Sequence, residues 1–257
     1  MQPPNPQISP IPPITLVGAG RVGGSIHRAL IAAGADARLL GRDESGGGDA
    51  EAVLLCVPDG EIESACRRAV ATTPHLRFAG HTSGSRSLSA LDSAAAAGVD
   101  CFSLHPLQTV PDGATDLTGA PAAIAGTTPG AVAFAHAIAD RCQMVPFDVP
   151  EESRAAYHAA AAIASNFLVA LEASAEELLE AAGIDDAREL LAPLVLRTAA
   201  NWAERGEAAL TGPIARGDEA TVAAHLDAIA AAAPRLLPLY EALAERTREI
   251  AACRERR

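Results

Sequence analysis

Apolar residues follow two different periods along the chain, and the change between them falls near residue 150. Before it, short apolar runs alternate with stretches of helical periodicity, and Gly, Pro or Asp separates one from the next. Such alternation predicts an α/β domain built on a doubly wound parallel sheet. We expect its strands at 14–17, 36–40, 52–57, 77–81, 100–104, 122–125 and 143–147.

After Pro150 the apolar period is helical throughout, which predicts an all-α C-terminal domain. Its helices are expected at 151–182, 186–206, 218–232 and 235–253. The boundary therefore lies near residue 149, with a sheet domain at 14–149 and a helical domain at 150–257. Prolines dominate residues 1–13, so this leader is expected to be extended or disordered.

The motif Gly18-Ala19-Gly20-Arg21-Val22-Gly23 separates the first expected strand from a helix expected over 21–33. In this setting Gly18 makes the tight turn, Gly20 lets the backbone approach a pyrophosphate, and Gly23 lets helix and strand pack closely. Free N–H groups at the helix N-terminus then hold the phosphates. The motif predicts a Rossmann dinucleotide-binding domain; the alternative is a glycine-rich turn with a purely structural role.

The residues at the end of the second expected strand indicate whether the site prefers NAD(H) or NADP(H). Sites that prefer NAD place Asp or Glu there to bind the ribose 2′-hydroxyl, whereas this chain has Gly41-Arg42. Glycine leaves room, and arginine can bind a 2′-phosphate through two hydrogen bonds. The pattern favours NADP(H), although Asp43 and Glu44 follow directly and Arg42 could instead be a solvated surface residue. Val57-Pro58, at the end of the third apolar run, is also assigned to cofactor binding.

Charge and composition exclude some partners. The formal net charge is −12 and the pI is about 5.0, so neither nucleic acid nor an anionic membrane is expected as a partner. The longest uncharged run, 155–171, is short and rich in alanine, which indicates a buried helix rather than a membrane span. The N-terminus shows no signal pattern and the five cysteines are scattered, which favours a reducing, cytoplasmic location.

Several segments resemble those of known reductases. They are His81-Thr82-Ser83-Gly84, the run SLHPLQT at 103–109, and Tyr157-His158 with Ser165-Asn166 and LTGPIARGD at 210–218. The chain resembles the group that includes pyrroline-5-carboxylate reductase, β-hydroxyacid dehydrogenases and prephenate dehydrogenase. It is more similar to an uncharacterised reductase-like family whose helical domain has no known function. The resemblance covers residues 14 to about 250 and implies the fold, the cofactor class and a homodimer formed through the helical domain.

The chain departs from these relatives in two places. Only about ten residues join the second expected strand to the third, where relatives usually have another helix and strand that cover the adenine. The chain also contains no lysine: if Asn166 matches the asparagine of β-hydroxyacid dehydrogenases, their catalytic lysine is replaced by Ala162. Proton transfer must then use another group, and histidine is the natural acid near neutral pH.

His105 is the first candidate, because it follows an expected strand at the edge where open α/β sheets bind ligands. His105-Pro106 resembles the catalytic His-Pro of prephenate dehydrogenases, which is paired with a serine on the preceding strand end. Ser83 or Ser85 could fill that place. The alternative is a histidine that caps its loop, and support of the turn is the better role for His81.

The first helix of the second domain adds further candidates. His158, Ala162 and Asn166 recur at a spacing of four, so His158 and Asn166 share a helical face that could line the cleft. A histidine that packs between helices is the alternative. Arg216 could bind a carboxylate, or its loop could serve only at the dimer contact. The tyrosines are discounted as proton donors, because a phenol pKa near 10 matches neutral pH poorly.

The leading hypothesis is an NADP(H)-dependent oxidoreductase that transfers hydride to a small oxo acid or imine. A prephenate-dehydrogenase-like oxidative decarboxylation is the alternative enzyme, suggested by His105-Pro106. A non-catalytic NADP(H)-binding sensor or assembly module is the alternative of another class, suggested by the missing lysine and the short adenine side.

Overall fold

The computed structural model describes residues 11–41, 44 and 47–255. Residues 1–10 of the expected leader lie outside this range, as does Arg42. The chain forms two compact units, residues 1–163 and residues 164–257. The change from strands to helices near residue 150 thus precedes the division between the units, and one long helix begins within the sheet unit.

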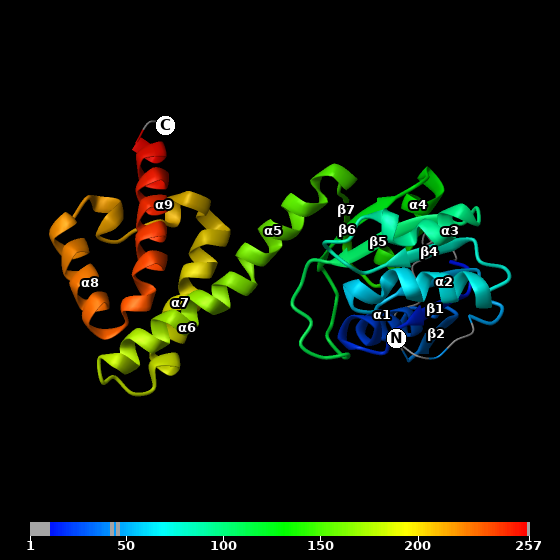
Figure 1. The fold of residues 1–257 in the computed structure, drawn as a ribbon, viewed down its shortest axis with the longest axis horizontal. Coiled ribbons are helices and arrows are strands. Elements are labelled where there is room, and N and C mark those ends of the chain that lie inside the picture. Colours follow the sequence, from blue (N-terminus) through cyan, green and yellow to red (C-terminus); the bar gives the residue numbers. More distant parts are fainter. Residues whose placement is uncertain (1–10, 42–43, 45–46, 256–257) are drawn as a thin grey trace. The chain divides into compact units, whose positions relative to one another are not determined.

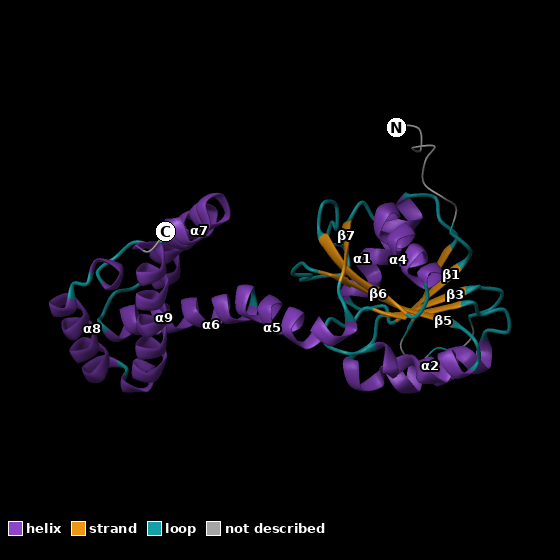
Figure 2. Cartoon of the chain, turned by 90° about the horizontal axis from the view of Figure 1, so that it is seen from above, coloured by secondary structure: helices purple, strands orange, loops and turns teal. Residues whose placement is uncertain are grey.

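In the described part of the chain, the sheet unit has seven strands in the order β2-β1-β3-β4-β5-β6-β7 (Figures 1 and 2). The single departure from the predicted parallel sheet is the antiparallel pair β5–β6. It arises because the chain between them is a loop, and a parallel connection requires a longer crossover. The strands are β1 (Ile14–Val17), β2 (Ala37–Leu40), β3 (Ala52–Leu55), β4 (Phe78–His81), β5 (Asp100–Pro106), β6 (Pro121–Gly126) and β7 (Val145–Asp148).

Helices cover both faces of the sheet. Successive strand residues point to opposite faces, so Leu54 joins one buried cluster and Leu55 the other. Ile26 and Phe134 belong to the first cluster, and Ile62 belongs to the second. The first cluster packs under α1 (Arg21–Ala32) and α4 (Pro129–Arg141), and the second under α2 (Ile62–Thr72) and α3 (Asp92–Ala96).

The helical unit follows α5 (Arg154–Ala164), which begins in the sheet unit. The single helix expected over 151–182 is interrupted at Ser165, whose backbone (φ −122°, ψ −69°) departs from helical values. The helices of this unit are α6 (Asn166–Ala181), α7 (Ala187–Arg205), α8 (Glu219–Ala232) and α9 (Leu237–Glu255).

The expectation of a buried helix at 155–171 is wrong for the single chain. Ile163, Phe167 and Val169 are 62%, 56% and 69% exposed. By length and composition alone, residues 151–181 would be apolar enough to cross a membrane, a property that by itself does not identify a membrane protein. This stretch therefore presents apolar side chains that the described residues do not cover.

Candidate functional site

The glycine turn after β1 has the tight geometry that its sequence predicts. Gly18 has φ +109°, a conformation that favours glycine, and a Cβ there would collide with the carbonyl oxygen of Cys56. A Cβ on Gly23 would collide with the carbonyl oxygen of Gly18. Around Gly20, by contrast, no described atom lies within 4 Å of a Cβ position. Two of the three glycines thus serve the packing of the turn, and Gly20 borders open space.

The first turn of α1 is suited to an anion. Ala19, Gly20 and Arg21 are exposed, and the first turn of the helix contains no acidic side chain. No described side chain caps its N-terminus, so its first N–H groups remain available. The open space at Gly20 is where a pyrophosphate would approach these N–H groups. The residues present therefore fit a dinucleotide phosphate.

The neighbouring strand ends border this turn. Val57 is buried, and its side chain lies 3.3 Å from the position of a Cβ on Gly18. At the end of β2, the backbone N–H of Gly41 donates to Glu44 Oε2 at 2.9 Å. Arg42, predicted to bind a 2′-phosphate, lies outside the described residues. The carboxylate of Glu44 is therefore the described charge closest to that strand end.

The loop between β5 and β6 links His105 to the glycine turn. It packs on the first turns of α1, where Ser25 Oγ donates to the carbonyl oxygen of Asp112 at 3.2 Å. A Cβ on Gly24 would lie only 3.0 Å from the carbonyl oxygen of Gly113. Gly24 therefore allows the loop to lie against the helix, although it stands outside the three-glycine motif.

His105 lies within β5 and not after it, and its partner is a tyrosine. Its Nδ1 is 2.7 Å from the hydroxyl of Tyr157 on α5, and the two rings meet edge to face. When the phenol O–H donates to Nδ1, the hydrogen of the neutral ring is on Nε2; in the other tautomer, Nδ1–H donates to the phenol oxygen. Tyr157, which the sequence discounts as a proton donor, is thus in direct contact with the leading candidate.

His158 completes this group of aromatic side chains. Its ring centroid lies 6.0 Å from that of His105. A Cβ on Gly84 would lie 2.7 Å from Nδ1 of His158 and 2.9 Å from Nε2 of His105. The two imidazoles therefore face the backbone of Gly84, and a larger residue there would displace them.

Burial sets the protonation of the His105–Tyr157 pair. Desolvation, with smaller contributions from His158 and Arg154, lowers the pKa of His105 to about 4. Desolvation raises the pKa of Tyr157 to about 12, and the charge of Arg154 opposes that rise. At neutral pH the imidazole is therefore uncharged and the phenol keeps its proton, so His105 carries one ring hydrogen and not the second hydrogen of an imidazolium.

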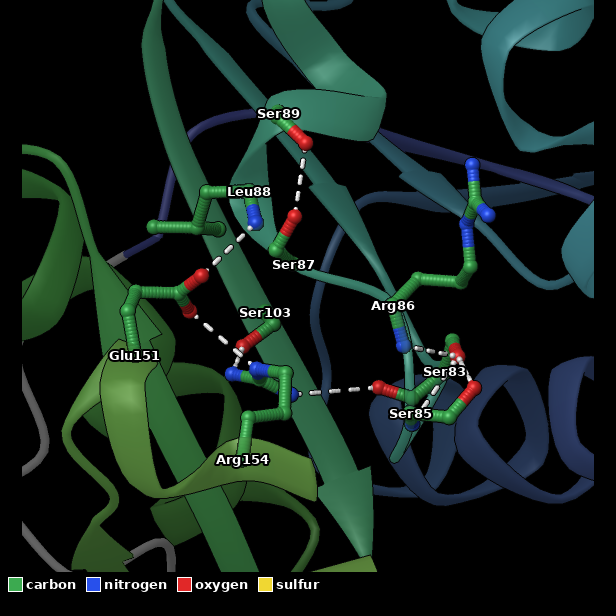
Figure 3. A network of polar contacts seen from close by, with 9 residues as sticks. All are labelled: Ser83, Ser85, Arg86, Ser87, Leu88, Ser89, Ser103, Glu151 and Arg154. Atoms are coloured by element: carbon green, nitrogen blue, oxygen red, sulfur yellow. Dashed lines mark hydrogen bonds and ion pairs between the residues drawn. The ribbon is translucent and has the colours of Figure 1, made fainter.

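Arg154 anchors α5 to the strand ends and is 2% exposed (Figure 3). Its Nε donates to Glu151 Oε1 at 3.1 Å, and its Nη1 donates to the carbonyl oxygen of Ser83 at 3.3 Å. Its Nη2 donates to the hydroxyl of Ser103. A buried guanidinium needs such partners, and these three fix the first turn of α5 beside β4 and β5. Tyr157 and His158 follow on the same helix.

The structure does not pair Ser83 with His105. The Ser83 hydroxyl accepts hydrogen bonds from the backbone N–H groups of Ser85 and Arg86, at 3.2 and 3.0 Å (Figure 3). Ser85 Oγ donates to Asp59 Oδ2 at 2.6 Å. These bonds shape the loop after β4, so the serines support the site through its backbone.

The remaining sequence candidates lie elsewhere. His81 is fully buried, and burial lowers its pKa to about 4, as suits a histidine inside the fold. Asn166 begins α6 in the helical unit, beyond the interruption at Ser165, and its role beside His158 stays a prediction.

A comparison with protein families identifies the second half of the chain. Residues 120–247 match a family described as a domain of unknown function, DUF2520. The chain carries a DUF2520 domain. This confirms the resemblance to an uncharacterised family that joins a Rossmann unit to a helical domain. No curated protein matches the sequence.

Solved structures share the fold of this chain over nearly its whole length. A protein from Thermotoga maritima is 24% identical with a TM-score of 0.76, and the match covers 95% of this chain and 100% of that one. A Bacteroides fragilis protein, whose name proposes an NADP oxidoreductase, is 24% identical with a TM-score of 0.75 over 93% and 98%. An imine reductase from Myxococcus stipitatus, in complex with NADP+, is 15% identical with a TM-score of 0.64 over 94% and 95%. These likenesses confirm the predicted fold class.

The sequence patterns do not predict two residues of the candidate site, Tyr157 and Arg154. Tyr157 stands beside His158 in one of the segments that carry the resemblance, and that position is its only signal. Arg154 has no motif; its signal is an arginine in an alanine-rich, otherwise uncharged helix. Neither pattern indicates which strand ends the helix lies against. The contacts of Tyr157 and Arg154 with residues of the sheet unit therefore cannot be predicted without the fold.

Proposed function

We propose that this protein is an NADP(H)-dependent oxidoreductase that reduces the C=O or C=N bond of a small oxo acid or imine. One observation carries the proposal: an open glycine turn at the end of β1 shares a sheet edge with the His105–Tyr157 pair. Open α/β sheets bind ligands at this edge. The names of the Bacteroides fragilis and Myxococcus stipitatus proteins support the choice of cofactor and reaction class.

The side chains at this edge can polarise a substrate and supply its proton. Bound NADPH would provide the hydride. Nε2–H of the neutral His105 donates a hydrogen bond to the substrate oxygen or nitrogen. As that atom gains negative charge, the Nε2 proton moves to it and the Tyr157 proton moves to Nδ1. Arg154 favours the phenolate left behind, because its charge lowers the pKa of Tyr157.

The test of the proposed function is the oxidation of NADPH in the presence of a panel of small oxo acids and cyclic imines. The reaction is followed by the absorbance of the reduced nicotinamide, at about 340 nm. Turnover with any member supports an oxidoreductase. Tight NADPH binding without turnover across the panel would instead support the sensor or assembly module. No contact among the described residues favours the prephenate-like alternative, since the partner of His105 is Tyr157 and not Ser83.

We expect NADPH to bind more tightly than NADH, because Arg42 can pair with the 2′-phosphate. Arg42→Ala should remove most of this preference, about 1–3 kcal/mol for a charged hydrogen bond. Glu44→Gln is the matched variant: its carboxylate lies at the same strand end and opposes a second negative charge, so its loss should strengthen NADPH binding. Fluorescence titration with both cofactors measures each preference, and equal affinities in the wild type would contradict the prediction.

We also propose a cytoplasmic homodimer formed through the helical unit. α6 and α7 pack together and expose large apolar side chains, with Leu194 63%, Leu196 71% and Trp202 66% exposed. Patches of this kind usually mark an interface. Light scattering in detergent-free buffer should therefore give twice the chain mass of 26.2 kDa.

Leu194→Glu should shift the dimer toward monomer, because it places a charge in the apolar patch. Val145→Glu is the control, since Val145 is 57% exposed on β7 of the sheet unit. A monomeric wild type at micromolar concentration would refute the dimer. Partition of the wild type into lipid vesicles would instead assign the apolar stretch at 151–181 to a membrane.

A further inference from the structure

A second concave site lies wholly within the helical unit. The segment that connects α7 to α8 packs against α9 (Figure 1). Both line a cavity of about 440 Å³. Thr211 and Arg216 line it from the connecting segment, and Ala251 and Arg254 line it from the last turns of α9. This volume falls in the range of small-molecule sites.

The charge of this cavity is opposite to that of the chain. The formal net charge is −12, yet the lining contains two guanidiniums and no carboxylate. Four other arginines of the helical unit are neutralised by neighbours, in the pairs Arg188–Glu176, Arg235–Glu177, Arg246–Glu249 and Arg248–Glu219. Arg216 and Arg254 form no ion pair with any residue that the structure describes. Two positive charges therefore remain available to a ligand.

The carboxylate of Asp218, two residues after Arg216, already has hydrogen-bond partners. Asp218 accepts hydrogen bonds from the backbone N–H of Thr221 at 3.1 Å and from its hydroxyl at 2.7 Å, which caps α8. These bonds, and to a smaller degree the charge of Arg216, lower the pKa of Asp218. Asp218 therefore serves the helix end and does not fill the cavity.

The shape of the cavity is held by the backbone. Arg254 Nη1 donates to the carbonyl oxygen of Leu210 at 3.0 Å, which fixes the guanidinium and leaves its other N–H groups free for a ligand. Gly212 turns the chain with φ +101°, a conformation that favours glycine. Ala215 and Ala251 leave the space between the two arginines unfilled.

We propose that this cavity binds a small molecule through a carboxylate or phosphate group, which Arg216 and Arg254 hold from two sides. A planar guanidinium matches either group with two parallel hydrogen bonds. Thr211 supplies a hydroxyl at the rim. The cavity lies within the helical unit, and its assignment does not depend on the proposed oxidoreductase activity.

The test is calorimetric titration of the full chain, saturated with NADP+, with inorganic phosphate and separately with succinate. NADP+ keeps phosphate out of the glycine turn. We expect one of the two anions to bind, and Arg216→Gln and Arg254→Gln each to weaken it by at least about tenfold. Arg67→Gln is the control: Arg67 is an exposed arginine on α2, so this variant changes the net charge equally and should bind as the wild type does.

Each outcome decides the question. Preference for phosphate or for succinate identifies the anionic group, and Arg216→Lys should recover only part of the affinity because it loses the two-pronged geometry. Unchanged affinity in both glutamine variants, equal weakening by Arg67→Gln, or no binding of either anion would overturn the proposal. If NADP+ itself fails to bind, the oxidoreductase proposal fails, whereas the same variants still test the cavity in the free protein. Unchanged thermal unfolding midpoints confirm that the variants fold.

Discussion

Replacing His105 by alanine is expected to slow NADPH turnover by at least roughly a hundredfold, the loss typical of a positioned acid–base group. NADPH affinity should stay unchanged, because His105 belongs to β5 and is not part of the glycine turn after β1. The measurement is single-turnover oxidation of NADPH with whichever panel member reacts, beside a cofactor titration. Circular dichroism checks the fold, since the variant leaves the half-buried Tyr157 hydroxyl without its partner.

Tyr157→Phe and the pH profile separate a proton relay from a simple hydrogen bond. If the Tyr157 proton follows the His105 proton, Tyr157→Phe should also lose rate, although His105 keeps its Nε2–H. Because burial lowers the pKa of His105 to about 4, the wild-type rate should show no break at the ordinary histidine pKa of 6.5. A break in the pH–rate profile near pH 6.5 that disappears in His105→Ala would show that His105 becomes protonated in the active enzyme. That result would refute the neutral-imidazole mechanism.

His158→Ala distinguishes the two neighbouring histidines. Its ring faces His105 across Gly84, but it is exposed and forms no hydrogen bond with Tyr157 among the described residues, so a smaller loss of rate is expected. Near-full activity in His105→Ala together with a large loss in His158→Ala would transfer the role to His158. Full activity in both variants would mean that water or the substrate provides the proton.

Gly20→Ala is expected to weaken NADPH binding on the order of a hundredfold while leaving the protein as stable as before. A Cβ at Gly20 meets no described atom within 4 Å, and the backbone there (φ −81°, ψ −165°) suits any residue. The cost to the fold should therefore stay below about 1 kcal/mol, the difference between residues at a helix N-cap. The cost to binding is larger, because the methyl group occupies the space through which a pyrophosphate reaches the N–H groups of α1.

Gly23→Ala is the matched control, in which the larger effect is expected on the stability of the fold. Its Cβ would collide with the carbonyl oxygen of Gly18 and would lie 2.9 Å from Cys56 Cβ, so the turn itself must shift. Overpacking of this kind costs about 1–3 kcal/mol, visible as a lower unfolding midpoint in urea. Unchanged NADPH affinity in Gly20→Ala would show that no dinucleotide phosphate uses this turn, and the cofactor assignment would fail.

The sequence by itself determined what depends on residues close together in the chain. The strand and helix pattern of residues 14–148 follows from local apolar periods, and the three-glycine turn follows from steric limits on neighbouring backbone atoms. The capping of α8 by Asp218 involves residues three apart and depends equally on local geometry. Such features need no knowledge of the fold, because the groups that make them are brought together by helix or turn geometry alone.

Only the tertiary structure decided which distant residues meet. The antiparallel β5–β6 pair depends on a loop that returns without a helix, and the His105–Tyr157 bond joins residues 52 positions apart. Arg154 is buried because α5 returns to the strand ends, where Ser83, Ser103 and Glu151 satisfy its donors. A sequence pattern reports which side chains are apolar or charged. The protonation of His105 and Tyr157 is set by burial and by charges from other elements, and those are properties of the assembled fold.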